Sequence, residues 1–332
     1  MEQGTPRMLD TLWQDSRHAI RTLRNDPGFA AITALSLAFG IGANTAIFSL
    51  INAVMLKPLP VSHPEQLVQV TAGGGGGEYF SNPVWEQIRD RQDAFSGIFA
   101  YCRWGFDLAP GGEARQVDGA YVSGHYFDTL GVPAVLGRTL TTEDDYRGCA
   151  GGAVLTHGFW QREYGSRTDI LGRSISIDRH PFEIVGVAAR GFNGLEVGAS
   201  VDLIVPICAE KILHGDNTLL DADPSGRWLR ILGRPRPGTP ASDASARLRV
   251  LAPEVFRGTV RSKWSAQDRE KWLRLSLMVQ GAATGLSYLR ENYGQALLIL
   301  MAIAGIVLLI VCANVSNMLL ARGEARDRKS VV

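Results

Sequence analysis

Two long stretches without charged residues bracket most of this chain of 332 residues. Residues 29–56 and residues 294–321 each contain 28 positions with no Asp, Glu, Lys or Arg. A helix needs about 20 mostly apolar residues to cross the hydrocarbon core of a bilayer, so each stretch is long enough to span it with some tilt. The sequence therefore predicts a membrane protein in which two transmembrane helices flank a large domain, residues 57–293.

The whole-chain composition hides this division. The net charge is +1 and the mean hydropathy is +0.01, values that are typical of a soluble globular protein. They arise here because two apolar stretches are averaged with a polar domain. The chain has no basic excess, so nothing in its charge indicates a nucleic-acid partner.

The flanking basic residues predict the orientation in the membrane. Seven lie on the outer flanks of the two stretches and two lie on the inner flanks: Arg17, Arg21, Arg24, Arg322, Arg326, Arg328 and Lys329 against Lys57 and Arg290. Lys and Arg stay cytoplasmic, so residues 1–28 and 322–332 are expected inside and the large domain outside. The alternative for the first stretch is a cleaved signal peptide, which its leader of 28 residues and its long apolar run disfavour.

The segment before the first stretch has the pattern of an amphipathic helix. Leu9, Leu12, Trp13, Ile20 and Leu23 share one face at three- and four-residue spacing, and polar residues fill the other. We expect this helix to lie in the cytoplasmic interface of the membrane. Packing against the surface of a partner protein is an equally good interpretation.

Small and amide side chains interrupt both apolar stretches. Gly40, Gly42 and Asn44 lie in the first, and Asn314 and Asn317 lie in the second. Such residues let helices approach closely and form hydrogen bonds across the contact. Two helices alone bury them poorly, so we expect further helices, from a missing part of the chain or from a second copy. Alternatively the amides lie near the headgroups, an interpretation that is weaker for Asn44.

The domain between the stretches is predicted to be mixed α and β. Strands are expected where apolar and polar residues alternate, and helices where apolar residues recur every three or four positions. The expected strands are residues 66–70, 116–122, 153–155, 174–177, 182–187, 202–206 and 228–232, and the expected helices are 83–92, 126–130, 157–164 and 241–255. Residues 174–177 and 182–187 are expected to form a hairpin.

No catalytic, cofactor or metal motif stands out. Residues 73–77 are five glycines, but no Gly-Lys-Ser/Thr follows, so we interpret them as a flexible loop near the membrane instead of a phosphate cradle. The six histidines lack metal-ligand spacing. Glu143, Asp144 and Asp145 form an acidic cluster, which we interpret as a solvated loop in preference to a cation site. We therefore predict that the chain is not an enzyme.

Three cysteines lie in the domain expected to face an oxidising compartment: Cys102, Cys149 and Cys208. One pair can close there and leave one thiol. Nothing in the sequence selects the pair.

Five segments, in order, resemble the MacB/FtsX-like permeases of ATP-binding-cassette systems, and most of all the duplicated orphan permeases of acidobacteria. Together they cover well over half of the chain. They are residues 15–60 (DSRHAIRTLRNDPGF…), 117–145 (VDGAYVSGHYFDTLG…), 153–207 (AVLTHGFWQREYG…), 228–248 (WLRILGRPRPGT…) and 297–322 (LLILMAIAGIVLL…).

The resemblance implies more than the patterns do. Such permeases carry four membrane helices per unit and lie in the bacterial inner membrane, with a periplasmic core domain of two lobes between the first and second helix. By analogy the inserted lobe is expected at roughly residues 133–206 of this chain. The ATPase is a separate domain or polypeptide on the cytoplasmic side. Because this chain stops shortly after the second stretch, we expect a fragment that lacks further helices.

The expected function is that of a non-catalytic permease subunit, which couples a partner ATPase to motion of its periplasmic domain for export or mechanotransmission. A periplasmic partner protein is a further candidate, and no cofactor is expected. The alternative is a membrane-anchored periplasmic sensor or ligand-binding module.

Overall fold

The computed structural model describes residues 27–52, 56–108, 115–149, 151–221 and 226–330. The chain forms two compact units. One, here called the helix pair, combines the described helices of Met1–Lys57 and Tyr288–Val332. The other is the central domain, Pro58–Ser287. The two units are considered separately below.

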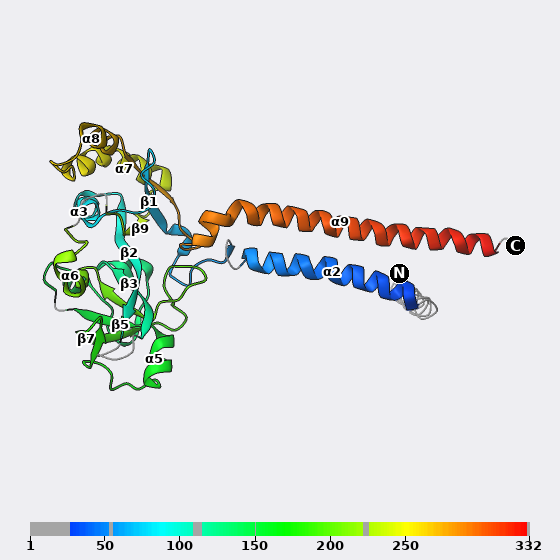
Figure 1. Ribbon diagram of the computed structural model, residues 1–332, viewed down its shortest axis with the longest axis horizontal. Helices are drawn as coiled ribbons and strands as arrows, with labels where there is room; N and C mark the ends of the chain where they lie inside the picture. Colours follow the sequence, from blue (N-terminus) through cyan, green and yellow to red (C-terminus); the bar gives the residue numbers. More distant parts are fainter. Residues whose placement is uncertain (1–26, 53–55, 109–114, 150, 222–225, 331–332) are drawn as a thin grey trace, which may run out of the picture. The chain divides into compact units, whose positions relative to one another are not determined.

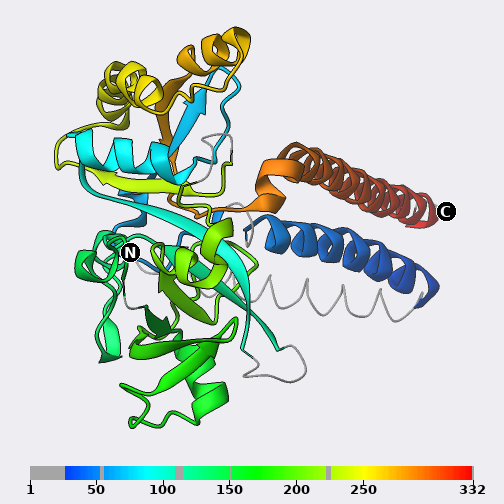
Figure 2. The same cartoon turned by 60° about the vertical axis from the view of Figure 1, so that its left-hand side comes forward.

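The helix pair consists of α2 (Pro27–Ile51) and α9 (Tyr288–Ser330), which lie side by side in Figures 1 and 2. Asn44 contacts Ala304 and Gly40 faces Leu308, so the two helices run antiparallel. Both are long and apolar enough to cross a membrane, through windows at Ala34–Ile51 and Asn292–Asn317. Only 11% and 6% of these windows are buried, so neither is the core helix of a soluble domain.

The central domain is built on one mixed sheet, which has ten strands among the described residues. The spatial order is β10-β1-β9-β2-β3-β8-β5-β7-β4, and β6 pairs with β7. Neighbours are antiparallel except for the parallel pairs β3–β8 and β5–β7. The strands are β1 (Val68–Gly73), β2 (Phe95–Asp107), β3 (Gln116–Val122), β4 (Ala134–Gly137), β5 (Gly152–Leu155), β6 (Ser174–Ile177), β7 (His180–Ala188), β8 (Leu203–Pro206), β9 (Arg230–Pro235) and β10 (Ser276–Gly281).

Helices and short turns cover this sheet. Figure 1 shows α7 and α8 at one end of the central domain and α5 with β7 at the other. The helices are α3 (Asn82–Arg91), α4 (Tyr126–Leu130), α5 (His157–Tyr164), α6 (Ala209–His214), α7 (Ala241–Gly258) and α8 (Ala266–Leu273). Three short 3-10 turns are η2 (Pro64–Gln66), η3 (Thr142–Asp144) and η4 (Gly215–Asn217).

Both faces of the middle of the sheet are buried, because side chains along β2, β3, β5, β8 and β9 alternate between two apolar clusters. On β2, Ile98 and Ala100 belong to one cluster while Phe99 and Tyr101 belong to the other. The first cluster includes Trp85 of α3 and Leu248 of α7, and the second includes Tyr126 and Phe127 of α4. The central domain therefore has a core on each side of its sheet.

Several local predictions agree with the structure. Residues 116–122, 126–130 and 157–164 form β3, α4 and α5 with the predicted bounds. The hairpin of β6 and β7 is present, with Ile177 paired to His180. Elsewhere the bounds shift by a few residues: β1 begins at Val68, β9 begins at Arg230, and α7 continues to Gly258.

The central strand β2 was missed. Gly97, Arg103 and Gly105 interrupt the alternation that marks a strand, so its sequence pattern is weak. The structure explains Gly97, because a Cβ there would lie 2.5 Å from Oγ1 of Thr129. Strands β4 and β10 and helices α6 and α8 were also missed, since each is short.

The five glycines form a turn at the end of β1, and their flexibility stays a prediction. Gly73 ends β1, and the amide of Ala72 donates to the carbonyl of Gly77 across 2.8 Å. Gly74, Gly75 and Gly77 have φ values of 71°, 86° and 77°, a region that favours glycine. The turn lies at the Gly73–Ser276 end of the β1–β10 ladder, opposite the Val68–Gly281 end.

Candidate functional site beside the disulfide

A cleft of about 520 Å³ lies in the central domain between α3, the loop after β3 and the segment that follows η3. Its volume is within the range of small-molecule pockets. Its walls combine aromatic and charged side chains with backbone. The lining residues are Asn82, Trp85, Glu86, Arg89, Asp90, Ser123, Gly124, His125, Thr142, Asp145, Tyr146, Arg147, Ile207, Cys208 and Leu220.

A disulfide closes one wall of this cleft. Cys149 and Cys208 are bonded, with a sequence separation of 59 and 6.0 Å between their Cα atoms. The bond joins the segment after η3 to the residue that precedes α6. Cys102 and Cys312 are free thiols. The structure thus selects one of the pairings that the sequence left open.

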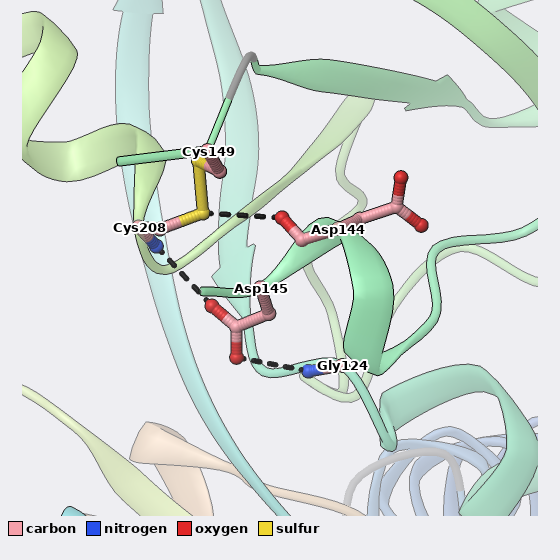
Figure 3. The surroundings of a disulfide bond; sticks show 5 residues. All are labelled: Gly124, Asp144, Asp145, Cys149 and Cys208. Atoms are coloured by element: carbon pink, nitrogen blue, oxygen red, sulfur yellow. Dashed lines mark hydrogen bonds between the residues drawn. A yellow bond between two sulfur atoms is a disulfide. The ribbon is translucent and has the colours of Figure 1, made fainter. Parts of the chain in front are cut away.

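Asp145 connects three segments at this wall, as Figure 3 shows. Its carboxylate accepts the amide of Gly124 at 3.0 Å and that of Cys208 at 3.3 Å. Gly124 must lack a side chain, because a Cβ would lie 2.5 Å from the Cα of Thr142. Partial burial raises the pKa of Asp145, although the two amides oppose that rise.

Asp144 binds a different set of groups from Asp145. Its carboxylate accepts the amide of Thr141 at 2.8 Å, closing a capping box on η3, and pairs with Arg138 at 2.6 Å. Partial burial acts to raise the pKa of Asp144, but the bonds from Arg138 and Thr141 outweigh it and lower that pKa. Of the acidic cluster only Glu143 is exposed, so the prediction of a solvated loop is wrong for the two aspartates.

Arg147 bridges the cleft from the disulfide side to α3. Its guanidinium lies 2.6 Å from the carboxylate of Asp221 and 3.2 Å from that of Glu86. The bond to Asp221 raises the pKa of Arg147 and lowers the pKa of Asp221. Exposed ion pairs of this kind contribute little stability each, so the bridge is a contact that can open at small cost.

A second polar centre lies where the chain begins the central domain. The guanidinium of Arg234, at the end of β9, donates to the carbonyls of Ser62, His63 and Thr129 at 2.5, 2.8 and 3.0 Å. Burial lowers the pKa of Arg234. Sequence analysis missed this residue, because most of its partners are backbone atoms, which carry no sequence signal.

The first and last segments of the central domain are joined to each other. The amide of Leu59 donates to Ala283 at 3.0 Å, and the amide of Ala282 donates to Leu67 at 2.8 Å. Residues 59–67 therefore move with residues 282–283, and Arg234 ties this junction to β9 and to the end of α4.

The helix pair contains the candidate packing residues. Nδ2 of Asn44 donates to the carbonyl of Ala304 on α9 at 3.0 Å and to Gly40 on its own helix at 3.2 Å. Gly40 is buried, and a Cβ there would meet Leu308 and Val311 at 3.5 Å, an ordinary contact distance.

The other three candidates do not join the contact between the two helices. Gly42, Asn314 and Asn317 are exposed, and a Cβ at Gly42 would meet nothing within 4 Å. Their role in packing stays a prediction. The candidates for the interfacial helix, namely Leu9, Leu12, Trp13, Ile20 and Leu23, lie outside the described residues.

The described part of the chain contains no group of three or more His, Cys, Asp or Glu side chains placed to hold a metal ion. The cleft presents charged groups on opposing walls, a disulfide and exposed ion pairs.

Comparison with solved structures finds domains of bacterial permeases. A domain of a putative permease from Porphyromonas gingivalis is 14% identical with a TM-score of 0.47, over 67% of this chain and 92% of that one. The extracellular domain of the noncanonic ABC-type transporter YknZ from Gram-positive bacteria is 13% identical with a TM-score of 0.43, over 64% and 99%. The periplasmic region of MacB from Actinobacillus actinomycetemcomitans is 13% identical with a TM-score of 0.44, over 71% and 94%.

A search of the curated proteins finds no significant match. The family model for the MacB-like periplasmic core domain matches residues 30–251, about two thirds of the sequence. The chain therefore belongs to the MacB-like periplasmic core domain family.

Proposed function

We propose that this protein is a non-catalytic permease subunit of a MacB/FtsX-like ABC system, related to the duplicated orphan permeases, that couples a partner ATPase to motion of its central domain. The family is one of permease components of ABC-type transporters. The observation that carries the proposal is the junction of the two ends of the central domain. Backbone hydrogen bonds join residues 59–67 to residues 282–283, and Arg234 ties Ser62 and His63 to β9. A movement of residues 59–67 or of residues 282–283 would then displace the sheet.

The proposed orientation has both termini in the cytoplasm, an inner-membrane location, and the central domain in the periplasm. The disulfide between Cys149 and Cys208 supports it, because such bonds form and persist in oxidising compartments. The apolar surfaces of α2 and α9 support a place in the bilayer.

The proposed movement is a displacement of residues 133–206 relative to the rest of the central domain, with the cleft beside the disulfide opening or closing. Arg147 is suited to act as the latch, since it is exposed and pairs with carboxylates on the opposite wall. The disulfide joins Cys149 of this segment to Cys208, two residues after its end, so the two stay linked while the segment moves.

The test measures distance changes driven by ATP. Spin labels are placed at Val250→Cys on α7, which is 83% exposed, and Gly158→Cys on α5, where a Cβ has open space. The background is Cys102→Ala with Cys312→Ala, which removes the free thiols. The protein is reconstituted with its cognate ATPase, and distances are measured by electron double resonance with and without a trapped ATP state. We expect a shift on trapping.

The matched variants are Arg234→Gln and Arg236→Gln. Arg234→Gln removes the hydrogen bonds that tie the junction to β9 and α4, and we expect it to abolish the shift while ATP hydrolysis continues. Arg236 is exposed and two residues away, so its variant should behave as the parent does. If the distance between the two spin labels does not change with the state of the ATPase but changes when a small molecule binds in the cleft, the sensor function would be favoured instead.

A further inference from the structure

A second concave site lies at the other end of the central domain from α5, beside α8. This α8 pocket has a volume of about 560 Å³ and lies between the glycine turn and the α8 helix. Residues that line it include Gly75, Arg227, Trp264, Lys271, Trp272 and Arg274. None of them lines the cleft beside the disulfide.

The pocket has an excess of positive charge. In the described part of the chain, neither Arg227 nor Lys271 has a carboxylate within ion-pair distance, whereas Arg274 pairs with Glu270. The one acidic lining residue, Asp268, accepts the hydroxyl of Ser265 at 2.7 Å at the start of α8. The described lining thus has two cations without an ion-pair partner against one carboxylate, that of Asp268.

Aromatic side chains give the pocket a rigid wall. Trp272 is buried, and its indole N–H donates to the carbonyl of Phe256 and to Oγ1 of Thr259, both at 3.1 Å. Trp264 meets it edge to face with ring centroids 5.1 Å apart. The guanidinium of Arg227 lies over the Trp272 ring at 5.5 Å, which orients the cation.

The glycine turn forms the opposite rim. Arg227 also donates to the carbonyl of Gly76, so the turn and the cation hold each other in place. Gly76 has no room for a side chain, because a Cβ would lie 2.4 Å from the Cβ of Ala72. At Gly75 a Cβ would meet nothing within 4 Å, so the rim is bare backbone open to solvent.

We propose that the α8 pocket binds a small amphiphilic anion, a carboxylate or phosphate carried on a ring-sized apolar body. Arg227 and Lys271 supply charge-assisted hydrogen bonds for the anionic group. Trp264 and Leu275 supply apolar surface for the body. The volume is within the range of pockets that hold small ligands, and the fixed indole of Trp272 lowers the ordering cost of binding. This site is independent of the coupling function proposed above.

The test uses the full chain in detergent micelles and two fluorinated probes, para-fluorobenzoate and para-fluorophenyl phosphate. Binding is followed by fluorine NMR line broadening, with para-fluorobenzyl alcohol as the neutral control. We expect saturable binding of at least one anion that weakens as salt is added, and no saturable binding of the alcohol. The two anions distinguish carboxylate from phosphate ligands.

Lys271→Glu is the decisive variant, and Lys263→Glu is its matched control because Lys263 is exposed on the neighbouring loop and does not line the pocket. Loss of a charge-assisted contact and gain of repulsion should weaken anion binding by about tenfold or more in Lys271→Glu. Lys263→Glu should bind as the parent does. Circular dichroism confirms that both variants fold.

Three results would overturn the proposal. One is equal binding of an anion by the parent and Lys271→Glu. Another is equal weakening by the two lysine variants, which would indicate a general effect of surface charge. The third is the absence of saturable binding of either anion at millimolar concentration. Binding of an acidic peptide in place of both probes would assign the pocket to a protein partner and reject the small-ligand proposal.

Discussion

The central domain and the helix pair differ in where their apolar side chains lie. In the central domain Phe99 and Trp85 are almost fully buried, and cores lie on both faces of the sheet. In the helix pair Phe39 is 77% exposed and Leu309 is 70% exposed. The first unit completes its own packing, whereas the second presents its apolar surface outward. Exposed patches of this size on helices indicate a lipid environment or further helices.

The comparison also separates two uses of polar groups. In the central domain, carboxylates such as those of Asp144 and Asp145 bind backbone amides and fix loops. In the helix pair, Asn44 binds the carbonyl of Ala304 and fixes a helix contact. These polar side chains all form hydrogen bonds, and an unpaired buried polar group would cost free energy.

The largest expected effect is a cavity in the core of the central domain. Phe99→Ala should lower the free energy of unfolding of that domain by about 3–5 kcal/mol, since its ring is fully buried. Phe39→Ala removes the same atoms from the exposed face of α2 and should leave that value unchanged. Denaturant unfolding of the full chain in micelles, followed by circular dichroism, measures both. Equal losses of unfolding free energy in the two variants would contradict the distinction between a buried core and an exposed helix surface.

Loss of the disulfide should have the second-largest effect on stability. Replacing both Cys149 and Cys208 by Ala removes a bond that spans 59 residues and should cost about 2–4 kcal/mol of central-domain stability. Cys102→Ala removes a free thiol and serves as the control. Stability under oxidising and reducing conditions is compared for all three proteins. Parent protein that keeps its stability after complete reduction would contradict the role given to the bond.

Within the helix pair the effects should be smaller. Asn44→Leu removes the hydrogen bond to Ala304, and interhelical bonds in membranes contribute about 0.6–1.7 kcal/mol. Asn317→Leu changes an exposed amide outside the contact of the two helices and is the control. Unfolding in mixed SDS micelles reports the difference. If Asn317→Leu destabilises more, Asn317 contacts a further helix, and the contact with α2 is not the main packing surface.

The smallest expected effect is a dependence on pH. The folded state lowers the pKa of Asp144 below its ordinary value of 3.8. The stabilisation is therefore fully present above that value and is lost as pH falls through the lower pKa of the folded state. Asp144→Asn should flatten this acid-side loss by less than about 1 kcal/mol, because partly exposed pairs contribute little. Unfolding at several acidic pH values measures it, with Asp216→Asn as control. A steeper loss in Asp144→Asn would reverse the assigned sign.

Local pattern determined much of this protein. The two apolar stretches are readable without any structure, and so are elements such as β3, α4 and α5, whose bounds follow from alternation, helical spacing and a closing glycine such as Gly131. Each depends on interactions between residues a few positions apart, and a sequence displays those directly.

Tertiary structure alone decided the rest. The pairing of Cys149 with Cys208, the placement of β2 in the middle of the sheet and the contacts of Arg234 with Ser62 and Thr129 join positions that are far apart in the chain. The sequence predicted that Asp144 and Asp145 are solvated, because a bond to a backbone amide leaves no pattern in the sequence. Their carboxylates accept such amides in the structure. Such contacts depend on which segments the fold brings together, and that choice is made by the packing of the whole sheet, beyond any single stretch of sequence.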